Sequence, residues 1–216
     1  MKSLEDLVNY LQSEKYIKSE RVKSAFLNID RKKFVPYVYK DEAYFDEPLP
    51  IGENQTISAP HMVAIMLELA NIDRGMKILE IGSGSGYNAC LMEYLAYPGK
   101  VFTIERHRSL YLIARGNIKS CPHSENIQII EGDGSLGYSD EAPYDRIIVT
   151  CGAPDVPSPL LDQLKLNGLM IIPIGGSYIQ ELYLIKKTGN GIEKFDEGPV
   201  AFVPLRGKYG FSKDFY

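Results

Sequence analysis

Three acidic residues stand at places where each could hold part of a cofactor. Glu80 precedes a glycine-rich segment, Glu105 lies 19 residues after Gly86, and Asp133 lies between two glycines. Ligands bind outside the carboxyl ends of parallel strands, so three acids at strand ends would share one crevice. An acid placed like Glu105 is suited to accept hydrogen bonds from ribose hydroxyls. The three acids together predict an adenosine-type cofactor, although each alone also fits an ordinary strand end or turn.

A glycine-rich turn follows an apolar run. Residues 76–81 are mostly apolar, which predicts a short buried parallel strand. Gly82, Gly84 and Gly86 then let the backbone bend sharply and lie close to a ligand before a helix begins near Tyr87. A plain tight turn between strand and helix would show the same glycines. The third glycine of the dinucleotide fingerprint would fall on Tyr87, which disfavours a nicotinamide cofactor.

Composition places the chain among ordinary globular proteins. It has 216 residues, 44% of them hydrophobic and 24% charged, which suits one α/β domain. No stretch approaches the roughly 18 apolar residues that a membrane helix needs, so we expect no membrane partner. The first residues lack the pattern of a secretory signal, so we expect a cytoplasmic protein. The net charge of -4 disfavours a nucleic-acid partner.

The cysteines and histidines show no metal-binding pattern. Cys90, Cys121 and Cys151 lie far apart, are odd in number and form no C-x-x-C pair. We therefore expect three separate thiols, with neither a disulfide framework nor a zinc site. The three histidines also lack the spacing of metal ligands, so no metal is predicted.

Periodicity predicts the elements that must position the acids and the glycines. Residues 4–11 and 22–29 show helical spacing, whereas residues 31–50 lose it and carry prolines and aromatics, as in an ordered surface connection. Ser58 is expected to cap a helix over 60–70, with Pro60 in its first turn. The alternating pattern that follows predicts strands at 76–81, 101–105, 127–131, 145–150 and 169–173, with helices at 87–96, 109–119 and 158–165.

The C-terminal part of the chain changes character. Residues 180–187 and 199–205 are β-prone and flank a Gly-Asn-Gly turn, which predicts an antiparallel pair at the edge of the sheet. The expected fold class is α/β, with a Rossmann-like, doubly wound, mostly parallel sheet, an antiparallel C-terminal edge and an N-terminal helical extension. Within one domain we expect an N-terminal extension over 1–58, a core over 59–205 and a tail over 206–216.

Several stretches resemble one enzyme family. Residues 79–87, Leu-Glu-Ile-Gly-Ser-Gly-Ser-Gly-Tyr, look like the first motif of the class I methyltransferases that use S-adenosylmethionine. The stretch 55–63, Gln-Thr-Ile-Ser-Ala-Pro-His-Met-Val, is similar to protein-L-isoaspartate O-methyltransferases and is more specific than the glycine motif. Further similar stretches lie at 132–138, 142–145, 164–173 and 203–205, so the resemblance extends from residue 22 to about residue 205.

The resemblance implies a class I methyltransferase fold, a cofactor and roles for particular residues. S-adenosylmethionine would be the cofactor, proteins and peptides with isoaspartyl residues the partners, and Ser58 the catalytic residue. Glu105 would hold the ribose, and Asp133 with Gly134 would lie near the adenine. The implied cofactor-binding residues are Glu80, Ile81, Gly82, Ser83, Gly84, Ser85, Gly86, Glu105, Asp133 and Gly134. The implied substrate-binding residues are Thr56, Ile57, His61, Val203, Leu205 and Arg206.

Methyl transfer to a carboxylate asks for little acid–base chemistry. The methyl group of a sulfonium is already activated, and a carboxyl group with a pKa of about 4 is ionised at neutral pH, so no general base is required. The site must hold the reactants in line and exclude water. A hydrogen bond from the Ser58 hydroxyl could orient the carboxylate. In the alternative interpretation, Ser58 only caps the helix that begins at Pro60.

The sequence leaves other functions open. A methyltransferase could act on a small molecule or a nucleic acid, although residues 150–154 lack the Asn/Asp-Pro-Pro-Tyr/Phe motif of base-methylating enzymes. The chain could also be a non-catalytic interaction module that docks through its N-terminal helices, or a nicotinamide dehydrogenase. The family pattern itself is altered at residues 53–54 and 151–152. For isoaspartyl repair, we expect the substrate backbone to lie along an edge near residues 203–205.

Overall fold

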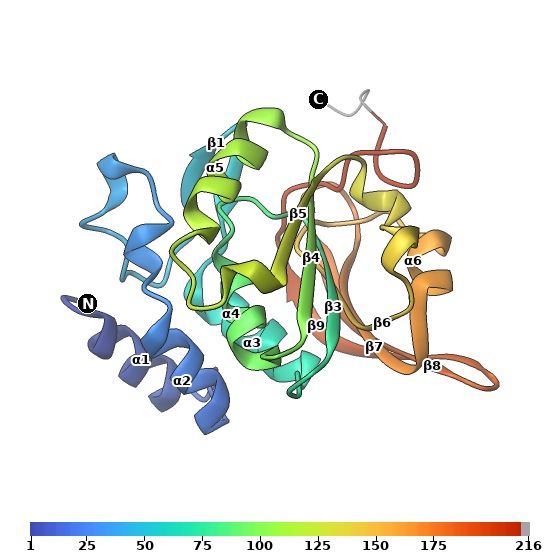
Figure 1. Cartoon of the computed structure of the whole chain (residues 1–216), viewed down its shortest axis with the longest axis horizontal. Coiled ribbons are helices and arrows are strands. Elements are labelled where there is room, and N and C mark those ends of the chain that lie inside the picture. The colour runs from blue at the N-terminus through green and yellow to red at the C-terminus, as the bar shows by residue number, and fades with distance from the viewer. Residues whose placement is uncertain (213–216) are drawn as a thin grey trace.

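The protein is built around a seven-stranded sheet (Figure 1). The computed structural model describes residues 1–212. The strands are β3 (Lys77–Ile81), β4 (Lys100–Glu105), β5 (Ile127–Glu131), β6 (Tyr144–Val149), β7 (Leu164–Gly175), β8 (Gln180–Thr188) and β9 (Gly191–Val200), in the order β5-β4-β3-β6-β7-β8-β9. Neighbouring strands from β5 to β7 are parallel, and β8 and β9 complete one edge antiparallel. The predicted fold class is confirmed.

The strand order reverses at β3. From β3 the chain adds β4 and β5 on one side and then β6 and β7 on the other. The carboxyl ends of β3 and β6 therefore adjoin at the topological switch point, where open α/β sheets bind ligands. Gly82 directly follows β3, and Thr150 directly follows β6.

Apolar side chains are buried on both faces of the sheet. Along β3, Ile78 belongs to one hydrophobic core, whereas Leu79 and Ile81 belong to the core on the opposite face. Along β6, Ile148 and Ile147 divide between the two cores in the same way. A strand that is buried on both faces needs a nearly continuous apolar run, so the mostly apolar residues 76–81 show no regular apolar–polar alternation.

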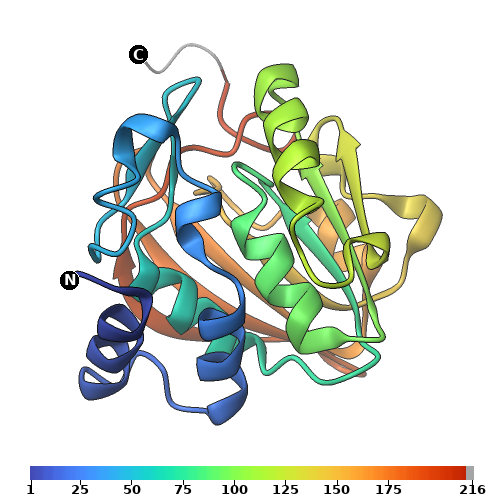
Figure 2. The same ribbon diagram turned by 60° about the vertical axis from the view of Figure 1, so that its left-hand side comes forward.

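Helices cover the two faces unequally. Except for Pro60 and Glu93, the buried residues of α1 (Leu4–Ser13), α2 (Glu20–Asn28), α3 (Pro60–Ala70), α4 (Tyr87–Ala96) and α5 (Arg108–Ile118) belong to one core. Figure 2 shows the N-terminal helices, α4 and α5 in front of the sheet. The short α6 (Ser158–Gln163) packs Leu160 into the opposite core. It ends two residues earlier than predicted because β7 begins at Leu164.

The segment between α2 and α3 is more regular than its sequence predicts. It contains a hairpin of β1 (Leu49–Gly52) and β2 (Gln55–Ile57). The two turn residues, Glu53 and Asn54, have positive φ angles of 52° and 55°, as in the type I′ turns that suit two-residue hairpins. Such short strands leave no readable alternation in the sequence. The structure also contains short 3₁₀ helices at Arg31–Lys33, Tyr37–Tyr39, Ser124–Asn126, Gly134–Leu136 and Ser139–Glu141.

The prediction of a last strand over residues 199–205 is wrong, because β9 spans Gly191–Val200. Thr188 pairs with Gly191 across a tight turn, so β9 starts immediately after the turn. Most of β9 is exposed, and its sequence therefore carries no apolar alternation. The chain then leaves the sheet, and Pro204 forms an isolated bridge with Gly152. Residues 213–216 of the predicted tail lie outside the described residues.

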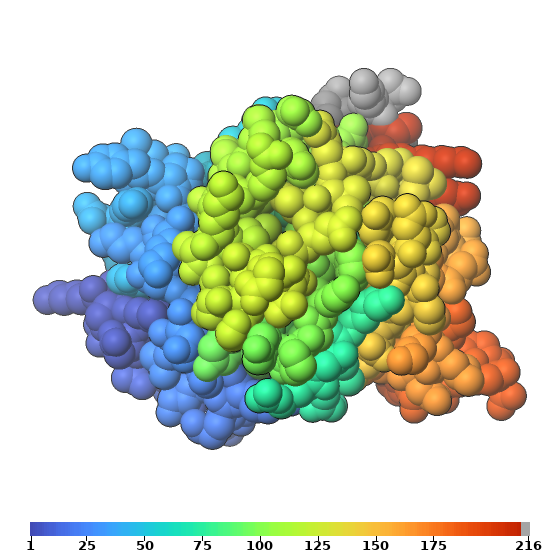
Figure 3. Space-filling model, in the orientation of Figure 1, coloured from blue at the N-terminus to red at the C-terminus, as the bar shows by residue number. Residues whose placement is uncertain are grey.

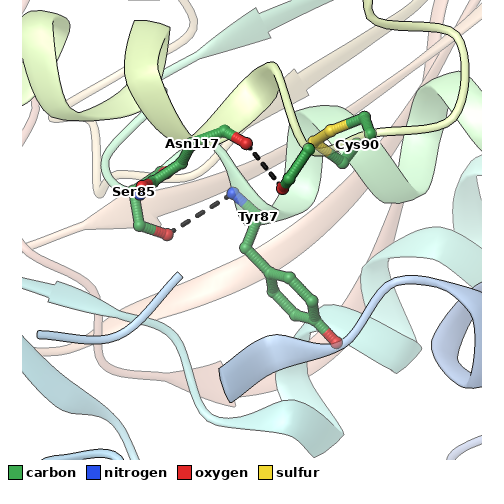
Figure 4. Close-up of a disulfide and its surroundings, with 6 residues drawn as sticks. Ser85, Tyr87, Cys90 and Asn117 are labelled. Carbon is green, nitrogen blue, oxygen red and sulfur yellow. Dashed lines mark hydrogen bonds between the residues drawn. A yellow bond between two sulfur atoms is a disulfide. The ribbon is translucent and has the colours of Figure 1, made fainter. Parts of the chain in front are cut away.

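Cys90 and Cys121 form a disulfide, so the expectation of three separate thiols is wrong. Cys90 lies on α4 and Cys121 follows α5, and their Cα atoms are 5.7 Å apart because these helices pack together. Figure 4 shows the disulfide beside the first turn of α4, with the Tyr87 ring pointing away from it. In the chain-entropy account, closing a loop of this length stabilises the fold by about 3–4 kcal/mol. Cys151 is free and buried.

The N-terminal helices and the β8–β9 hairpin lie far apart in the molecule (Figure 3). Figure 3 shows the N-terminal helices at one end and the β8–β9 hairpin at the other. Within residues 1–212, no helix combines the length and apolar character needed to cross a membrane.

Candidate functional site

Three adjoining cavities lie at the carboxyl ends of β3 and β6, and Thr56 and Thr150 line all three. We name each by one of its residues: the Glu105 cavity, the Glu80 cavity and the His61 groove. The predicted residues in the Glu105 cavity are Thr56, Ile81, Gly82, Gly84, Glu105, Gly134, Val203, Leu205 and Arg206. Those in the Glu80 cavity are Thr56, Ile57, Ser58, Glu80, Gly82, Ser83, Gly84 and Ser85. Those in the His61 groove are Thr56, Ser58, His61 and Val203.

The glycines at the strand ends are required by close contacts. Gly82 has a φ of +98°, and a Cβ at this position would lie 2.6 Å from the Thr150 Oγ1. The Thr150 hydroxyl donates toward the carbonyls of Ile81, at 2.9 Å, and Gly82, at 2.8 Å. A Cβ on Gly134 would lie 2.5 Å from the Cγ2 of Ile81. At both positions a side chain would overlap a neighbouring residue, so only glycine lets these segments pack so closely beside the Glu105 cavity.

Glu105 presents a buried carboxylate at the end of β4. Its side chain accepts hydrogen bonds from the backbone N–H groups of Gly84, at 3.0 Å, and His107, at 2.9 Å. The residue is only 5% exposed, yet it lines the cavity. Each carboxylate oxygen can accept more than one hydrogen bond, so this group can still accept bonds from a ligand.

Glu80 is fully buried beneath the glycine turn. It accepts hydrogen bonds from the Thr103 hydroxyl and, at 2.9 Å, from the Asn88 amide. Burial raises the pKa of Glu80 to about 8, and the nearby Glu105 raises it too, whereas the two hydrogen bonds act in the opposite direction. A carboxyl group with this pKa is mostly protonated at neutral pH and can ionise when a cation binds beside it.

Ser58 is not the cap of α3, contrary to the prediction. The N-cap position is Ala59, which makes no side-chain capping bond. Asp46 instead accepts the backbone N–H of His61 in the first turn, at 2.8 Å. Because this carboxylate supplies the capping bond from another segment, the Ser58 hydroxyl is not needed for it. Ser58 lines both the Glu80 cavity and the His61 groove.

Asp46 also orients the His61 ring. The Nδ1 atom of His61 lies 3.0 and 3.1 Å from the two Asp46 carboxylate oxygens. The hydrogen bonds from His61 lower the pKa of Asp46 against the opposing effect of burial. With Nδ1 held by Asp46, Nε2 is the ring nitrogen left for a molecule in the His61 groove.

Two predicted cofactor residues, Gly86 and Asp133, do not line these cavities within the described chain. Gly86 has a φ of +85° and packs close to Ile118 of α5. Glycine is needed here because of this backbone conformation and because a side chain would crowd α5. Asp133 accepts the backbone N–H of Ser135 at 2.9 Å and that of Lys208 at 2.8 Å. Asp133 therefore fastens the C-terminal segment beside the Glu105 cavity.

The edge predicted to bind a peptide, at residues 203–205, is paired with Gly152 along one side. The carbonyl of Val203 accepts the N–H of Gly152 at 2.8 Å, and the N–H of Leu205 donates to the Gly152 carbonyl at 2.7 Å. These backbone groups are already paired, so a peptide cannot use them as an open strand edge. Val203 and Leu205 contribute to the cavities as wall residues instead.

Sequence reasoning missed several residues of the site. Thr150 lines all three cavities, although its sequence context marks it only as the end of a predicted strand. The rule that ligands bind at carboxyl ends of strands, which pointed to Glu105, would also have indicated Thr150. Thr103 and Asn88 carried no comparable signal, because their role is to bond the buried Glu80. No group of three or more potential metal ligands occurs among residues 1–212.

Comparison with known proteins agrees with this geometry. The sequence profile of the family described as protein-L-isoaspartate(D-aspartate) O-methyltransferase (PCMT) matches residues 2–210. The chain belongs to this family. A protein-L-isoaspartate O-methyltransferase from Hyperthermus butylicus is 51% identical over 214 residues, covering 95% of this chain and 89% of the relative. The family resemblance seen in the sequence is thus confirmed.

Solved structures of PCMT proteins share the fold. A protein-L-isoaspartate O-methyltransferase structure superimposes with a TM-score of 0.85 at 33% identity, covering 96% of this chain and 67% of that one. A putative enzyme of this kind from Plasmodium falciparum, in complex with S-adenosyl-L-homocysteine, gives a TM-score of 0.81 at 33% identity, covering 93% and 97%. The PCMT family membership favours a methyltransferase over a nicotinamide dehydrogenase or a non-catalytic module.

Proposed function

We propose that this protein transfers a methyl group from S-adenosylmethionine to the free carboxylate of L-isoaspartyl residues in damaged proteins and peptides. The observation that carries this function is the position of Ser58. It lines the Glu80 cavity, together with residues of the glycine turn, and also the His61 groove. A hydroxyl at this junction can contact an acceptor in the groove next to a cofactor held by the turn.

The residues of the Glu105 cavity and the Glu80 cavity, which we call the two inner cavities, fit the cofactor. Gly82, Gly84 and Gly134 line these cavities with backbone alone and form a cradle for a ligand. Glu105 offers carboxylate oxygens suited to two ribose hydroxyls, and Glu80 offers an acid beside the turn for a cationic amino-acid end. We assign the nucleoside to the Glu105 cavity and the amino-acid end to the Glu80 cavity. When bound, S-adenosylmethionine supplies a methyl group on a sulfonium.

The protein's own contribution is orientation and exclusion of water. The acceptor carboxylate is ionised at neutral pH, so no residue has to remove a proton. Ser58 donates one hydrogen bond to this carboxylate and orients it without neutralising its charge. Ile57, Val63 and Met66 supply apolar wall to the Glu80 cavity. A dry wall favours transfer because opposite charges cancel as the methyl group moves.

Ser58→Ala is expected to lower the rate of methyl transfer by about tenfold, the value of one hydrogen bond of ~1.4 kcal/mol in the transition state. Cofactor affinity should stay within twofold, because other groups bind the cofactor. The measurement is transfer of labelled methyl to an isoaspartyl peptide, with the normal aspartyl peptide as substrate control. Ser13→Ala is the matched variant, since the Ser13 hydroxyl only bonds the Tyr10 carbonyl. Equal turnover of parent and Ser58→Ala would contradict the role of Ser58.

Cofactor binding is expected to release a proton from Glu80. With its pKa raised to about 8, Glu80 is protonated at pH 6.5, and a cationic group bound beside it favours the ionised form. Affinity should therefore rise as the pH increases toward 8. Calorimetric titration of S-adenosylhomocysteine at pH 6.5, in two buffers of different ionisation enthalpy, measures the release. Glu80→Gln should abolish it, and identical heats for the parent in both buffers would refute the prediction.

Substrate recognition follows from the His61 groove, which has a volume of about 560 Å³. We assign the isoaspartyl segment to this groove, with Thr56, His61 and Val203 as wall residues and Ile57 and Arg206 beside them in the inner cavities. A repair enzyme has to accept many sequences, so backbone contacts should dominate over side-chain contacts. Cytoplasmic location, the absence of nucleic-acid and membrane partners, and the division at residues 58 and 205 stay predictions of the sequence.

A further inference from the structure

Arg31 is an arginine buried completely inside the protein. Its exposed fraction is 0%, and it heads the set of largest fully buried side chains. It begins the 3₁₀ helix Arg31–Lys33, in the segment that the sequence indicated as a surface connection. An arginine here loses its hydration, which costs several kcal/mol unless other groups compensate. The presence of a charged residue at this buried position therefore requires an explanation other than packing.

The guanidinium of Arg31 bonds the backbone of the candidate site. One terminal nitrogen donates to the carbonyl of Ser58 at 2.7 Å, and the other donates to the carbonyl of Glu47 at 3.2 Å. The Nε has no hydrogen-bond partner among the described residues. The shorter of the two bonds is thus made to the peptide group of the residue that lines both the Glu80 cavity and the His61 groove.

Arg31 also contacts the residue that follows the glycine turn. Its guanidinium carbon lies 5.7 Å from the ring centroid of Tyr87, the first residue of α4. The Tyr87 ring packs against Phe26 and Phe34 at centroid distances of 6.3 and 5.3 Å, and it lines the Glu80 cavity. Arg31 thus joins two walls of that cavity, one from the Ser58 segment and one from the start of α4.

The charge of Arg31 has no ion-pair partner within residues 1–212. Burial lowers its pKa to about 10, against the opposing influence of Tyr87 and Asp46, so the group stays charged at neutral pH. Two carbonyl dipoles, the face of the Tyr87 ring and the more distant charge of Asp46 compensate a buried cation less well than a directly bonded carboxylate would. A simple packing role would be met by an apolar side chain of similar volume.

We propose that Arg31 is a positioning residue for methyl transfer, which fixes the Ser58 peptide group so that the hydroxyl keeps its place between the Glu80 cavity and the His61 groove. The inference rests on the role of Ser58 proposed above. Arg31 lines none of the three cavities and so acts through Ser58 without touching the substrate.

The test compares Arg31→Met, which removes charge and donors, with Arg31→Lys, which keeps the charge but cannot reach both carbonyls in the same fork. We expect Arg31→Met to lower kcat about tenfold while the Kd of S-adenosylhomocysteine changes less than twofold, with Arg31→Lys intermediate in kcat. Arg21→Met is the matched control. Arg21 bonds Asp73 and the Leu95 carbonyl away from the site, so its loss should leave kcat unchanged.

A kcat for folded Arg31→Met within twofold of the parent would overturn the inference, as would a loss of cofactor affinity equal to the loss of kcat. Circular dichroism and thermal unfolding establish that each variant folds. If Arg31→Met does not fold, Arg31→Lys decides, because parental kcat in that variant also overturns the proposal.

The double variant Arg31→Met with Ser58→Ala separates the two roles. If Arg31 acts through Ser58, its kcat should match that of Ser58→Ala alone within twofold, whereas multiplied losses would contradict the inference. Unchanged turnover of Ser58→Ala alone would instead refute the role of Ser58. An impaired Ser58→Ala beside a fully active Arg31→Met would refute only the role of Arg31.

Discussion

Glu105→Ala is expected to weaken binding of S-adenosylhomocysteine by about 100-fold or more. The carboxylate would hold two ribose hydroxyls, and hydrogen bonds to a charged group contribute about 1.5–3 kcal/mol each. The variant also removes the acceptor for the N–H of Gly84, so the glycine turn loses a support at the same time. Isothermal titration calorimetry measures the effect directly. A 100-fold loss of affinity corresponds to about 2.8 kcal/mol, because each tenfold change corresponds to ~1.4 kcal/mol.

The neighbouring strand provides a matched control. Glu131 ends β5 in register with Glu105 but does not line the three cavities, and it forms an ion pair with Arg108. Glu131→Ala should leave the Kd unchanged, and Glu105→Gln, which keeps one acceptor oxygen, should lie between parent and alanine variant. An unchanged Kd for Glu105→Ala would remove this residue from the ribose site.

Gly82→Ala is expected to damage both stability and cofactor binding. Its φ of +98° is a conformation that side-chain-bearing residues rarely adopt, and its Cβ would overlap the Thr150 hydroxyl. Holding alanine in such a conformation costs about 1–3 kcal/mol. If the turn shifts to relieve this strain, the cradle deforms, and affinity should fall by roughly tenfold or more. Chemical unfolding and calorimetry of the same preparations measure the two effects.

A second glycine tests the physical cause. Gly116 lies inside α5 with ordinary φ and no atom within 4 Å of a Cβ, so Gly116→Ala should stabilise the protein by about 0.5–1 kcal/mol. It should not change cofactor affinity. Adding Thr150→Ala to Gly82→Ala removes the overlapping hydroxyl and should restore part of the stability, while the φ strain remains. A Gly82→Ala protein with parental stability and affinity would show that the turn tolerates a side chain.

The sequence predicted the parts of the molecule that repeat a pattern. The strands from β3 to β7 are apolar runs long enough to recognise, and the glycine turn and Glu105 follow from their position at strand ends. The predicted second member of the antiparallel pair was displaced, because β9 is exposed and its composition carries no apolar face. The β1–β2 hairpin escaped for a different reason, since strands of 4 and 3 residues are too short for an alternation to be recognised in the sequence.

Contacts between distant segments account for the other differences. The disulfide depends on α4 and α5 packing side by side, which the spacing of Cys90 and Cys121 does not reveal. Asp46 supplies the capping bond that Ser58 was expected to make, although it comes from a segment without periodic structure. Arg31 has the local sequence of a surface residue, and only the fold buries it behind Ser58.

The position of Ser58, where the His61 groove adjoins the Glu80 cavity, sets a limit on which damaged proteins can be repaired. A folded substrate protein cannot enter the Glu80 cavity. Its isoaspartyl carboxylate therefore has to reach Ser58 from the His61 groove, carried by a short segment of the substrate chain. That stretch must unfold locally in the substrate protein. The free energy of such local opening ranges from near zero in loops and termini to the full free energy of unfolding in a core. Repair should therefore be rapid at isoaspartyl sites in loops and frayed termini. In a rigid helix or strand, repair should be slower because the substrate protein must first unfold locally.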